Sequence, residues 1–432
     1  LVGFGTRHTL SVQDDPRRGI GAARRWAEAE FRRIGRGCRN CLTIALPERM
    51  VMGARVPVPT RLVNVLAIQR GTERRNEVVI IAGHIDSRVT DVMNATADAP
   101  GANDDGSGTA AVIEAARVLS RHHYPTTIVY AVLSGEEQGL LGGQLLADYA
   151  RDQGWTVKAV LNNDIIGGTR GADGVIDETV RIFSEGPRAD ADDALRARAR
   201  REGGDNDSPS RNLSRWLDAL AERSGIGIDV RQIWRADRFG RGGDHLPSLD
   251  AGFPAVRFSV GIEDYNHQHQ DLRTESGVTF GDTAAFMDFP YLARVTRLNV
   301  AALDTLARAP MPPAPGVEGA VSTDTTLHWD AVAGAVRYRV YRRATTDRDW
   351  QLVKETAEPA TAASQVIAHD DAGNPLTVNH PARFRVVMSG VRVDDWVFGV
   401  SSVAADGSES PVASAVPGGA FGPLSPSQAP KS

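Results

Sequence analysis

The stretch EVVIIAGHID, residues 77–86, decides the fold of this chain. It is apolar from Val78 to Ala82, without the alternation that one solvated face would impose, so it predicts a strand buried on both faces. TTIVYAVLSGEE (126–137) has the same pattern, and GSGTAAVIEAARVLSRHH (106–123), which lies between the two, has the periodicity of a helix. Strands that alternate with helices predict an α/β fold, in which a mostly parallel or mixed central sheet carries helices on both faces.

The same alternation continues on both sides of these elements. Towards the N-terminus, residues 17–36 have the pattern of an amphipathic helix and residues 61–71 that of a strand. Towards the C-terminus we expect strands at 156–168, 228–234 and 253–261, and a long helix at 281–308. The sequence therefore predicts one α/β domain over residues 1–308.

The composition changes at APMPPAPG (309–316), which has the composition of a proline-rich linker. Beyond it, short alternating strands separated by turn residues predict an all-β sandwich over residues 317–416. This segment resembles a fibronectin type III module through Trp329, the strand YRVYRR (338–343) and its final hairpin. The last stretch, 417–432, has the composition of a flexible tail.

Overall composition excludes several classes of protein. The 432 residues carry a formal net charge of −5, with 41% hydrophobic and 24% charged residues, which is ordinary for a soluble globular protein. No basic block indicates nucleic acid or an anionic membrane as a partner. The apolar runs are as short as strands, so we expect no transmembrane segment.

Two cysteines, Cys38 and Cys41, lie in the stretch GCRNC. They are too few to form a structural zinc site, and no thioredoxin-like βαβ pattern surrounds them. We expect a disulfide between them rather than free thiols, in a secreted or periplasmic protein. Leu1 is not an initiator methionine, so we expect a trimmed N-terminus, either by removal of a signal peptide or by shortening of the cloned chain.

Acidic side chains and histidines gather where the expected strands end. In open α/β sheets the carboxyl ends of the strands meet at the edge where ligands bind, so we expect these side chains to lie close together. The residues concerned are His84, Asp86, Asp104, Asp105, Glu136, Glu137, Asp164, His267, His269 and Asp271.

Taken singly, these residues have ordinary explanations. Asp104 and Asp105 can cap the helix that follows them, and Glu136 and Glu137 can interact with a helix dipole. Together, however, so many carboxylates in one crevice would repel one another unless cations lay between them. Histidine and carboxylate ligands suit zinc, and two metal ions bridged by a carboxylate and a water are a recurring arrangement in hydrolases. We therefore expect one acid of the NDDG turn to bridge two metal ions.

The order of these motifs resembles that of the co-catalytic zinc exopeptidases of metallopeptidase family twenty-eight, which include the secreted bacterial leucyl aminopeptidases. The resemblance is carried by the His-x-Asp strand end, by GANDDGSG (101–108), SGEEQGLLGG (134–143) and NNDIIGG (162–168), and by the later Tyr/His segment. It spans residues 1–308 and implies the zinc exopeptidase fold.

The resemblance also implies a ligand set for two zinc ions, for which cobalt or manganese could substitute. His84 and Asp164 would bind one ion, Glu137 and His269 would bind the other, and Asp104 would bridge both.

Further roles follow from the same resemblance. Glu136 would be the general base, and Asp86 would fix the tautomer of His84 through the other ring nitrogen. The family has a cis peptide after the bridging aspartate, so we expect a strained cis bond between Asp104 and Asp105.

The last ligand and the substrate-binding groups are left open by the sequence. The family pattern, a histidine followed by Asp-Thr four and five residues later, fits neither His267 nor His269 fully, and we prefer His269. The tyrosine that the aminopeptidases place four residues before an Asp-His pair is replaced here by Gly240. Candidates for binding the substrate or its carbonyl are Arg238, Phe239, Arg241 and Tyr265, whereas Asp244 and His245 can be supporting or purely structural.

The expected function is aminopeptidase action on peptide substrates. A carboxypeptidase of the same family is the main alternative, because Arg235, Arg238, Arg241 and Arg257 could bind a substrate carboxylate. Glutaminyl cyclisation and a non-catalytic, receptor-like binding role are further alternatives. The C-terminal module could contact a surface or polymer, or pack on the catalytic domain.

Overall fold

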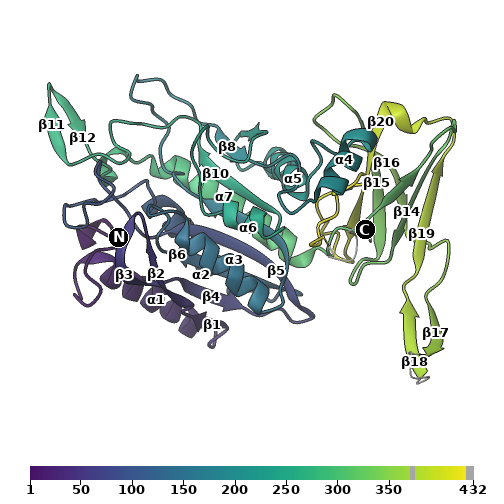
Figure 1. The fold of residues 1–432 in the computed structure, drawn as a ribbon, viewed down its shortest axis with the longest axis horizontal. Helices are drawn as coiled ribbons and strands as arrows, with labels where there is room; N and C mark the ends of the chain where they lie inside the picture. Colours follow the sequence, from purple (N-terminus) through teal and green to yellow (C-terminus); the bar gives the residue numbers. More distant parts are fainter. Residues whose placement is uncertain (370–374, 425–432) are drawn as a thin grey trace. The chain divides into compact units, whose positions relative to one another are not determined.

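The computed structural model describes residues 1–369 and 375–424 of the chain. It divides into two compact units (Figure 1). The first unit contains residues 1–185 and 216–307, and the second contains residues 186–215 and the chain from 308 onward. Each unit has its own sheets and its own hydrophobic core.

The first unit is built on a mixed sheet of eight strands. Its central strands β6, β5 and β7 run parallel, as does β10 next to β7, and antiparallel pairs flank this group. The mixed α/β fold that the sequence predicts is therefore confirmed. In spatial order the strands are β1 (Leu42–Ala45), β4 (Val65–Gln69), β6 (Thr126–Leu133), β5 (Arg74–His84), β7 (Thr156–Asn163), β10 (Ala255–Val260), β8 (Val180–Phe183) and β9 (Val230–Ile233).

Helices cover both faces of this sheet. Val78, Ile80 and Ala82 of β5 point into a core that α3 and α6 complete from one face. Gly83 points to the other face, where a Cβ atom would lie 2.6 Å from the carbonyl carbon of Gly108 in α2, so only glycine allows this close approach. The helices of this unit are α1 (Gly19–Gly37), α2 (Gly106–Leu119), α3 (Leu141–Asp152), the part of α5 (Pro209–Ser224) from Trp216 onward, α6 (Leu246–Asp250) and α7 (Phe289–Arg308). Among the described helices, none combines the length and apolar character that crossing a bilayer requires.

Several elements differ from their predicted limits; the strand expected at 156–168, for example, ends at Asn163. The strand expected at 61–71 is interrupted at Asn64, whose side chain accepts a hydrogen bond from the Ser134 amide (3.1 Å) and donates one to the Gly142 carbonyl (2.8 Å). The helix expected from residue 281 begins at Phe289. Shorter elements complete the unit: η1 (Val2–Phe4), the hairpin of β2 (Glu48–Gly53) and β3 (Val56–Val63), the hairpin of β11 (Arg273–Glu275) and β12 (Val278–Phe280), and η2 (Ala284–Phe286).

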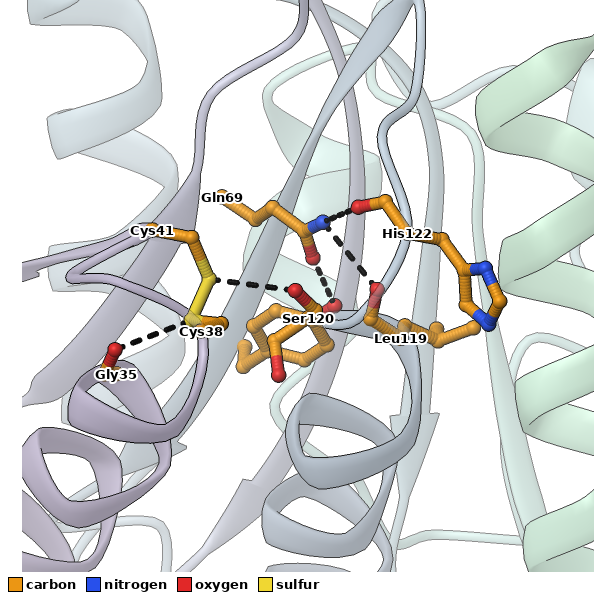
Figure 2. The surroundings of a disulfide bond; sticks show 8 residues. Gly35, Cys38, Cys41, Gln69, Leu119, Ser120 and His122 are labelled. Atoms are coloured by element: carbon orange, nitrogen blue, oxygen red, sulfur yellow. Dashed lines mark hydrogen bonds between the residues drawn. A yellow bond between two sulfur atoms is a disulfide. The ribbon is translucent and has the colours of Figure 1, made fainter.

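Cys38 and Cys41 form the expected disulfide, as Figure 2 shows. It closes the turn between the end of α1 and the start of β1, and Cys41 Sγ lies 3.4 Å from the carbonyl oxygen of Ser120, just after α2. Nearby, Gln69 Nε2 donates to the carbonyl oxygen of His122 (2.7 Å). The disulfide thus lies where α1, β1 and the end of α2 meet.

The second unit contains the predicted β-rich segment. A three-stranded and a four-stranded antiparallel sheet share a core that includes Trp329, Tyr338 and Phe384, and the rings of Trp329 and Phe384 stack 5.7 Å apart. The fibronectin type III resemblance stays a prediction. The strands are β13 (Gly316–Glu318), β14 (Thr325–Asp330) and β19 (Arg383–Met388) in one sheet, β16 (Gln351–Thr356), β15 (Arg337–Ala344), β20 (Trp396–Val403) and β21 (Ala413–Ser414) in the other, and β17 (Ser364–His369) with β18 (Pro375–His380) in a separate hairpin; η3 (Val393–Asp395) precedes β20.

A segment from the middle of the chain belongs to this second unit. Residues 186–215, which contain α4 (Asp193–Glu202) and the start of α5 (Pro209–Ser224), group with the C-terminal strands. The predicted domain boundary at residue 308 does not account for this segment, because its polar sequence has no pattern that indicates contact with the C-terminal strands. Arg188 donates to the carbonyl oxygens of Ala420 (2.6 Å) and Gly422 (3.0 Å), in the first part of the predicted flexible tail. The rest of that tail, 425–432, and residues 370–374 of the predicted module lie outside the described residues.

Candidate metal centre

Three adjacent parallel strands deliver the core of the site. β5 ends at His84, β6 ends three residues before Glu136, and β7 ends immediately before Asp164. Because β6, β5 and β7 are neighbours that run in the same direction, their carboxyl ends lie at one edge of the sheet. The sequence-based expectation that these groups come together is met by the structure.

The two acids of the NDDG turn have different tasks. Asp105 caps α2, since its carboxylate accepts a hydrogen bond from the Gly108 amide (2.8 Å), and it also accepts one from the His84 amide (2.9 Å). Asp104 takes no part in capping and faces the histidines instead. The peptide bond between Asp104 and Asp105 is cis, as expected. One acid therefore anchors the loop while the other reaches the site.

Two groups of potential metal ligands result, each with its ligand atoms within 4.8 Å of one another. The first contains His84, Glu136 and Asp164, and the second contains Asp104, Glu137 and His269.

Asp104 joins these two groups. Its Oδ1 lies 3.1 Å from His84 Nε2, and its Oδ2 lies 2.9 Å from His269 Nε2. His269 Nε2 is also 3.1 Å from Glu137 Oε1, and His84 Nε2 is 3.9 Å from Asp164 Oδ1. A carboxylate that offers one oxygen to each histidine has the geometry of a bridging ligand.

The electrostatics of the site favour positive charge. Burial lowers the pKa of His84, but Asp104, Asp164 and Asp86 outweigh it and raise the pKa well above its ordinary value. Burial likewise lowers the pKa of His269, but Glu137 and Asp104 raise it to about 10. The side chains therefore bind protons where a cation would otherwise lie.

Two buried atoms of the centre make no well-formed hydrogen bond. Among the described residues these include His84 Nε2 and Glu137 Oε1, although Asp104 Oδ1 lies 3.1 Å from the first and His269 Nε2 lies 3.1 Å from the second. Since buried polar atoms are nearly always paired, two such atoms, one in each ligand group, indicate that ligands bind beside them. The nitrogen and oxygen atoms of the cluster fit divalent zinc.

Asp86 contacts the other ring nitrogen of His84, as expected, but through its backbone carbonyl rather than its carboxylate. His84 Nδ1 lies 3.1 Å from the backbone carbonyl oxygen of Asp86, which is within hydrogen-bond distance, and 3.6 Å from its carboxylate, which is not. The Asp86 carboxylate instead accepts hydrogen bonds from the amides of Gly135 (2.9 Å), Glu136 (3.2 Å) and Glu137 (3.1 Å). It thus fixes the backbone that presents the two glutamates.

Between the two candidate histidines, the structure brings His269 to the centre. His267 faces Asp264 (2.9 Å), and its ring stacks on Phe286 at 3.6 Å. The sequence could not separate the two, because both lie in one short loop. His269 has φ of 55°, a left-handed backbone conformation that is uncommon for residues other than glycine.

A cavity of about 340 Å³ opens onto the centre. Of the predicted substrate-binding residues, Arg241 and Arg238 line it. Phe239 and Tyr265, which are 88% and 60% exposed, are not among the residues that line it.

Three polar side chains near the centre were missed by the sequence reasoning. Arg55 lines the cavity, and Arg88 does so while donating from Nε to Glu137 Oε2 (3.0 Å). Gln268 donates to Asp104 Oδ2 (3.1 Å). Arg55 and Arg88 lie in loops without a recognisable motif, so only their positions in the fold reveal them.

Asp244 and His245 have supporting roles in the structure. Asp244 accepts a hydrogen bond from the Gly143 amide at the start of α3 (2.9 Å), and His245 Nε2 lies 2.7 Å from the carbonyl oxygen of Ala236. Arg257, fully buried, contacts Asp164 Oδ1 (2.9 Å) and Asp237 Oδ1 (3.2 Å). These contacts place Asp164 and the loops around it.

Solved structures with a similar fold include two different kinds of enzyme. The LapA aminopeptidase of Legionella pneumophila is 20% identical, with a TM-score of 0.52 over 71% of this chain and 68% of that one. The glutaminyl cyclase of Fimbriiglobus ruber is 17% identical, with a TM-score of 0.50 over 70% of this chain and 90% of that one. At these identities the similarity shows a shared fold and no more.

Sequence comparisons are more specific. A probable zinc metalloprotease of Leptosphaeria maculans is 40% identical over 97% of this chain and 93% of its own length. A probable zinc metalloprotease of Pyricularia oryzae is also 40% identical, over 97% of this chain and 81% of its own length. The model of peptidase family M28 matches residues 64–280, which hold all the potential ligands described above. The chain therefore belongs to peptidase family M28.

Proposed function

We propose that this protein is a zinc-dependent aminopeptidase that removes N-terminal residues from peptides. The observation that carries the proposal is the position of Asp104, with one carboxylate oxygen 3.1 Å from His84 and the other 2.9 Å from His269. This geometry supports a centre for two ions, with Asp104 as the bridge.

The chain's own residues would divide the work. His84 and Asp164 would hold one zinc ion, Glu137 and His269 would hold the other, and cobalt or manganese could occupy the same ligands. When bound, the zinc ions would supply Lewis acidity toward the substrate carbonyl and the attacking water.

Glu136 is the proposed general base. It accepts a proton from the attacking water and returns it to the departing amine. Burial, together with the charges of Asp164, Glu137 and Asp244, raises the pKa of Glu136 well above its ordinary value, as is common for groups at functional sites. The Asp86 carboxylate accepts a hydrogen bond from the Glu136 amide and so helps to fix the position of the Glu136 side chain.

Other functions are less well supported by the site. The fold alone does not separate an aminopeptidase from a glutaminyl cyclase, because both kinds of enzyme share it. The two ligand groups joined by Asp104 favour a two-ion hydrolase over a cyclase with one zinc ion. A receptor-like protein would be expected to lack ligands, whereas all five are present here. Carboxypeptidase action remains the main alternative.

We also propose that the protein works in an oxidising compartment, secreted or periplasmic. The Cys38–Cys41 disulfide supports this, because such bonds persist mainly outside the reducing cytosol.

Hydrolysis of one short peptide, compared with its N-acetylated and C-amidated forms, tests the proposed reaction. We expect cleavage to need the free amine, to stop when a chelator removes the metal, and to fall at least about 100-fold in Glu136→Gln. Cleavage that needs the free carboxylate instead would establish a carboxypeptidase. Full activity in Glu136→Gln would refute the role of Glu136.

A further inference from the structure

Four arginines line the cavity that opens onto the metal centre. They are Arg55, Arg88, Arg238 and Arg241. The acids and the histidine of the metal centre form one side of the cavity, and the rest of its lining is Leu140 with three glycines, Gly139, Gly240 and Gly242. Away from the metal centre, this lining offers little apolar surface to an aliphatic side chain, and it presents many N–H donors to an anion.

The arginines of this wall do not each have an acidic partner of their own. The buried carboxylate of Glu263 is shared by Arg181 (2.8 Å), Arg238 (3.3 Å) and Arg241 (2.7 Å). Arg238 has a second acid, Asp237, at 3.0 Å, whereas Glu263 is the one acidic partner of Arg241 among the described residues. One carboxylate thus serves three guanidinium groups.

Arg55 and Arg241 keep most of their donors available. Arg55 makes one hydrogen bond, to the carbonyl oxygen of Glu137 (3.0 Å), and within the described part of the chain it has no acidic partner. Arg241 uses Nη1 for Glu263, and 31% of its side chain is exposed. A guanidinium has five N–H donors in a planar fork, which matches a carboxylate bidentately.

Arg88 can add to this wall. Its Nη2 lies 2.6 Å from His269 Nδ1, and its Nε donates to Glu137 Oε2 (3.0 Å). Arg88 thus connects the arginine-lined wall to the metal centre.

A different lining is found in a second cavity, of about 270 Å³, that also reaches Asp104. Ile165, Ile262 and Met287 contribute apolar surface there. A peptide bond held at Asp104 could therefore place one neighbouring side chain among apolar groups and the other among arginines.

We propose that the arginine-lined cavity selects substrates with a carboxylate next to the scissile bond, either the side chain of an aspartate or glutamate or a free C-terminal carboxylate. Arg241 and Arg55 bind this carboxylate and act as specificity-determining residues. The inference rests on the proposed peptidase function.

Matched peptides that differ by one charge test it. Glu-Ala-amide and Gln-Ala-amide vary the first residue, Ala-Glu-amide and Ala-Gln-amide vary the second, and Ala-Ala and Ala-Ala-amide vary the terminal carboxylate. In the pair that uses the cavity, we expect kcat/KM to be about 10- to 100-fold higher for the charged member. The pair that shows the preference identifies the source of the carboxylate.

The variants Arg241→Gln and Arg55→Gln test the residues. Each should lower the charged-to-neutral ratio about tenfold, whereas Arg49→Gln, an exposed arginine paired with Asp148 outside the cavity, should leave it unchanged. The Kd of each peptide for Glu136→Gln, measured by calorimetry, should show the same preference without any turnover.

The two proposals fail separately. Equal kcat/KM and equal Kd within all three pairs would overturn the charge selection while leaving peptidase action in place. Absence of hydrolysis of all six peptides would refute the proposed function itself. In that case equal Kd values would also refute the selection, and a preserved charge preference in Kd would support it as a binding property.

Discussion

Asp104 is the residue on which the proposed chemistry depends. Its two oxygens point to different histidines, while the carboxylate of the neighbouring Asp105 accepts hydrogen bonds from the Gly108 and His84 amides. Because Asp105 anchors the loop, Asp104 is held in place without having to bond to the backbone with its own carboxylate. A buried carboxylate between two imidazoles is stable only with a positive charge beside it.

At this scale the first prediction concerns the two histidines of one loop. We expect His269→Ala to lose bound zinc and to reduce kcat/KM more than about 100-fold, because His269 is the proposed nitrogen ligand beside Asp104 and Glu137. His267→Ala is the matched control, since its ring contacts Asp264 and Phe286 instead, and it should retain zinc. Zinc content by mass spectrometry, with hydrolysis rates, checks both. Loss of zinc in the His267 variant alone would reverse the assignment.

Single residues also mark the limit of what the sequence could predict here. His84, Asp104, Glu137 and Asp164 were identifiable because each follows a strand or lies in a recognisable turn. Arg88 and Arg55 were not, because a loop arginine has no periodic pattern or fixed spacing. Asp86 and its contact with His84 were identified, but the partners of its carboxylate were not, since they are backbone amides that only the folded turn at residues 135–137 brings near.

At the scale of elements, strand β7 leads into a proposed metal ligand and contains a buried lysine that lowers the stability of the folded state. Asp164 follows its carboxyl end, whereas Lys158, near its start, is fully buried. Lys158 Nζ donates to the Leu306 carbonyl oxygen (3.0 Å) and lies 3.4 Å from Glu77 Oε2. The strand was predictable from its apolar run, but a lysine within that run gave no indication of the carbonyl and carboxylate that receive it.

The buried lysine predicts a pH dependence of stability. Burial lowers the pKa of Lys158 from 10.5 to about 8, despite the opposing charge of Glu77. The folded state therefore holds this proton less tightly than the unfolded state, at a cost of about 3 kcal/mol below pH 8 that disappears as the pH rises toward 10.5. Unfolding by urea at pH 7 and pH 9 measures it.

The variant Lys158→Met separates the effect of Lys158 on the pH dependence of stability from the effects of all other titrating groups. Between pH 7 and pH 9 the free energy of unfolding of the unmodified protein should rise by about 1 kcal/mol relative to the variant. Zinc content should be the same in both proteins, since Lys158 lies at the opposite end of β7 from Asp164. A constant difference between the two proteins across this range would mean that Lys158 has the same pKa in the folded and unfolded states.

At the scale of the whole molecule, the chain is divided differently from a simple succession of domains. The proline-rich stretch at 309–316 and the change to short strands were visible in the sequence, because composition changes there. The grouping of residues 186–215 with the C-terminal strands was not visible, because it joins parts of the chain more than a hundred residues apart. The second unit is therefore assembled from two separate segments.

A buried polar network holds these two segments together. Asp207 is 3% exposed, contacts Arg343 of β15, and accepts a hydrogen bond from Ser414 Oγ (2.9 Å). Asn212 Nδ2 also donates to Ser414 Oγ (2.8 Å). Removing residues 309–432 would leave Asp207 without these partners, so we expect the shortened chain to unfold at a lower temperature than the full chain and to expose residues 186–215 to proteolysis.

Asp207→Ala tests the same network in the full chain. Because it leaves the buried Arg343 without its carboxylate, we expect a loss of about 3 kcal/mol in the free energy of unfolding. Asp330→Ala is the matched control: its partner Arg383 is 3.6 Å away, both side chains are 61% exposed, and the loss should stay below about 1 kcal/mol. Two results would contradict this account: equal losses in the two variants, or a shortened chain as stable as the full one. Either would show that the C-terminal strands do not stabilise residues 186–215. The second unit would then be only a spatial grouping.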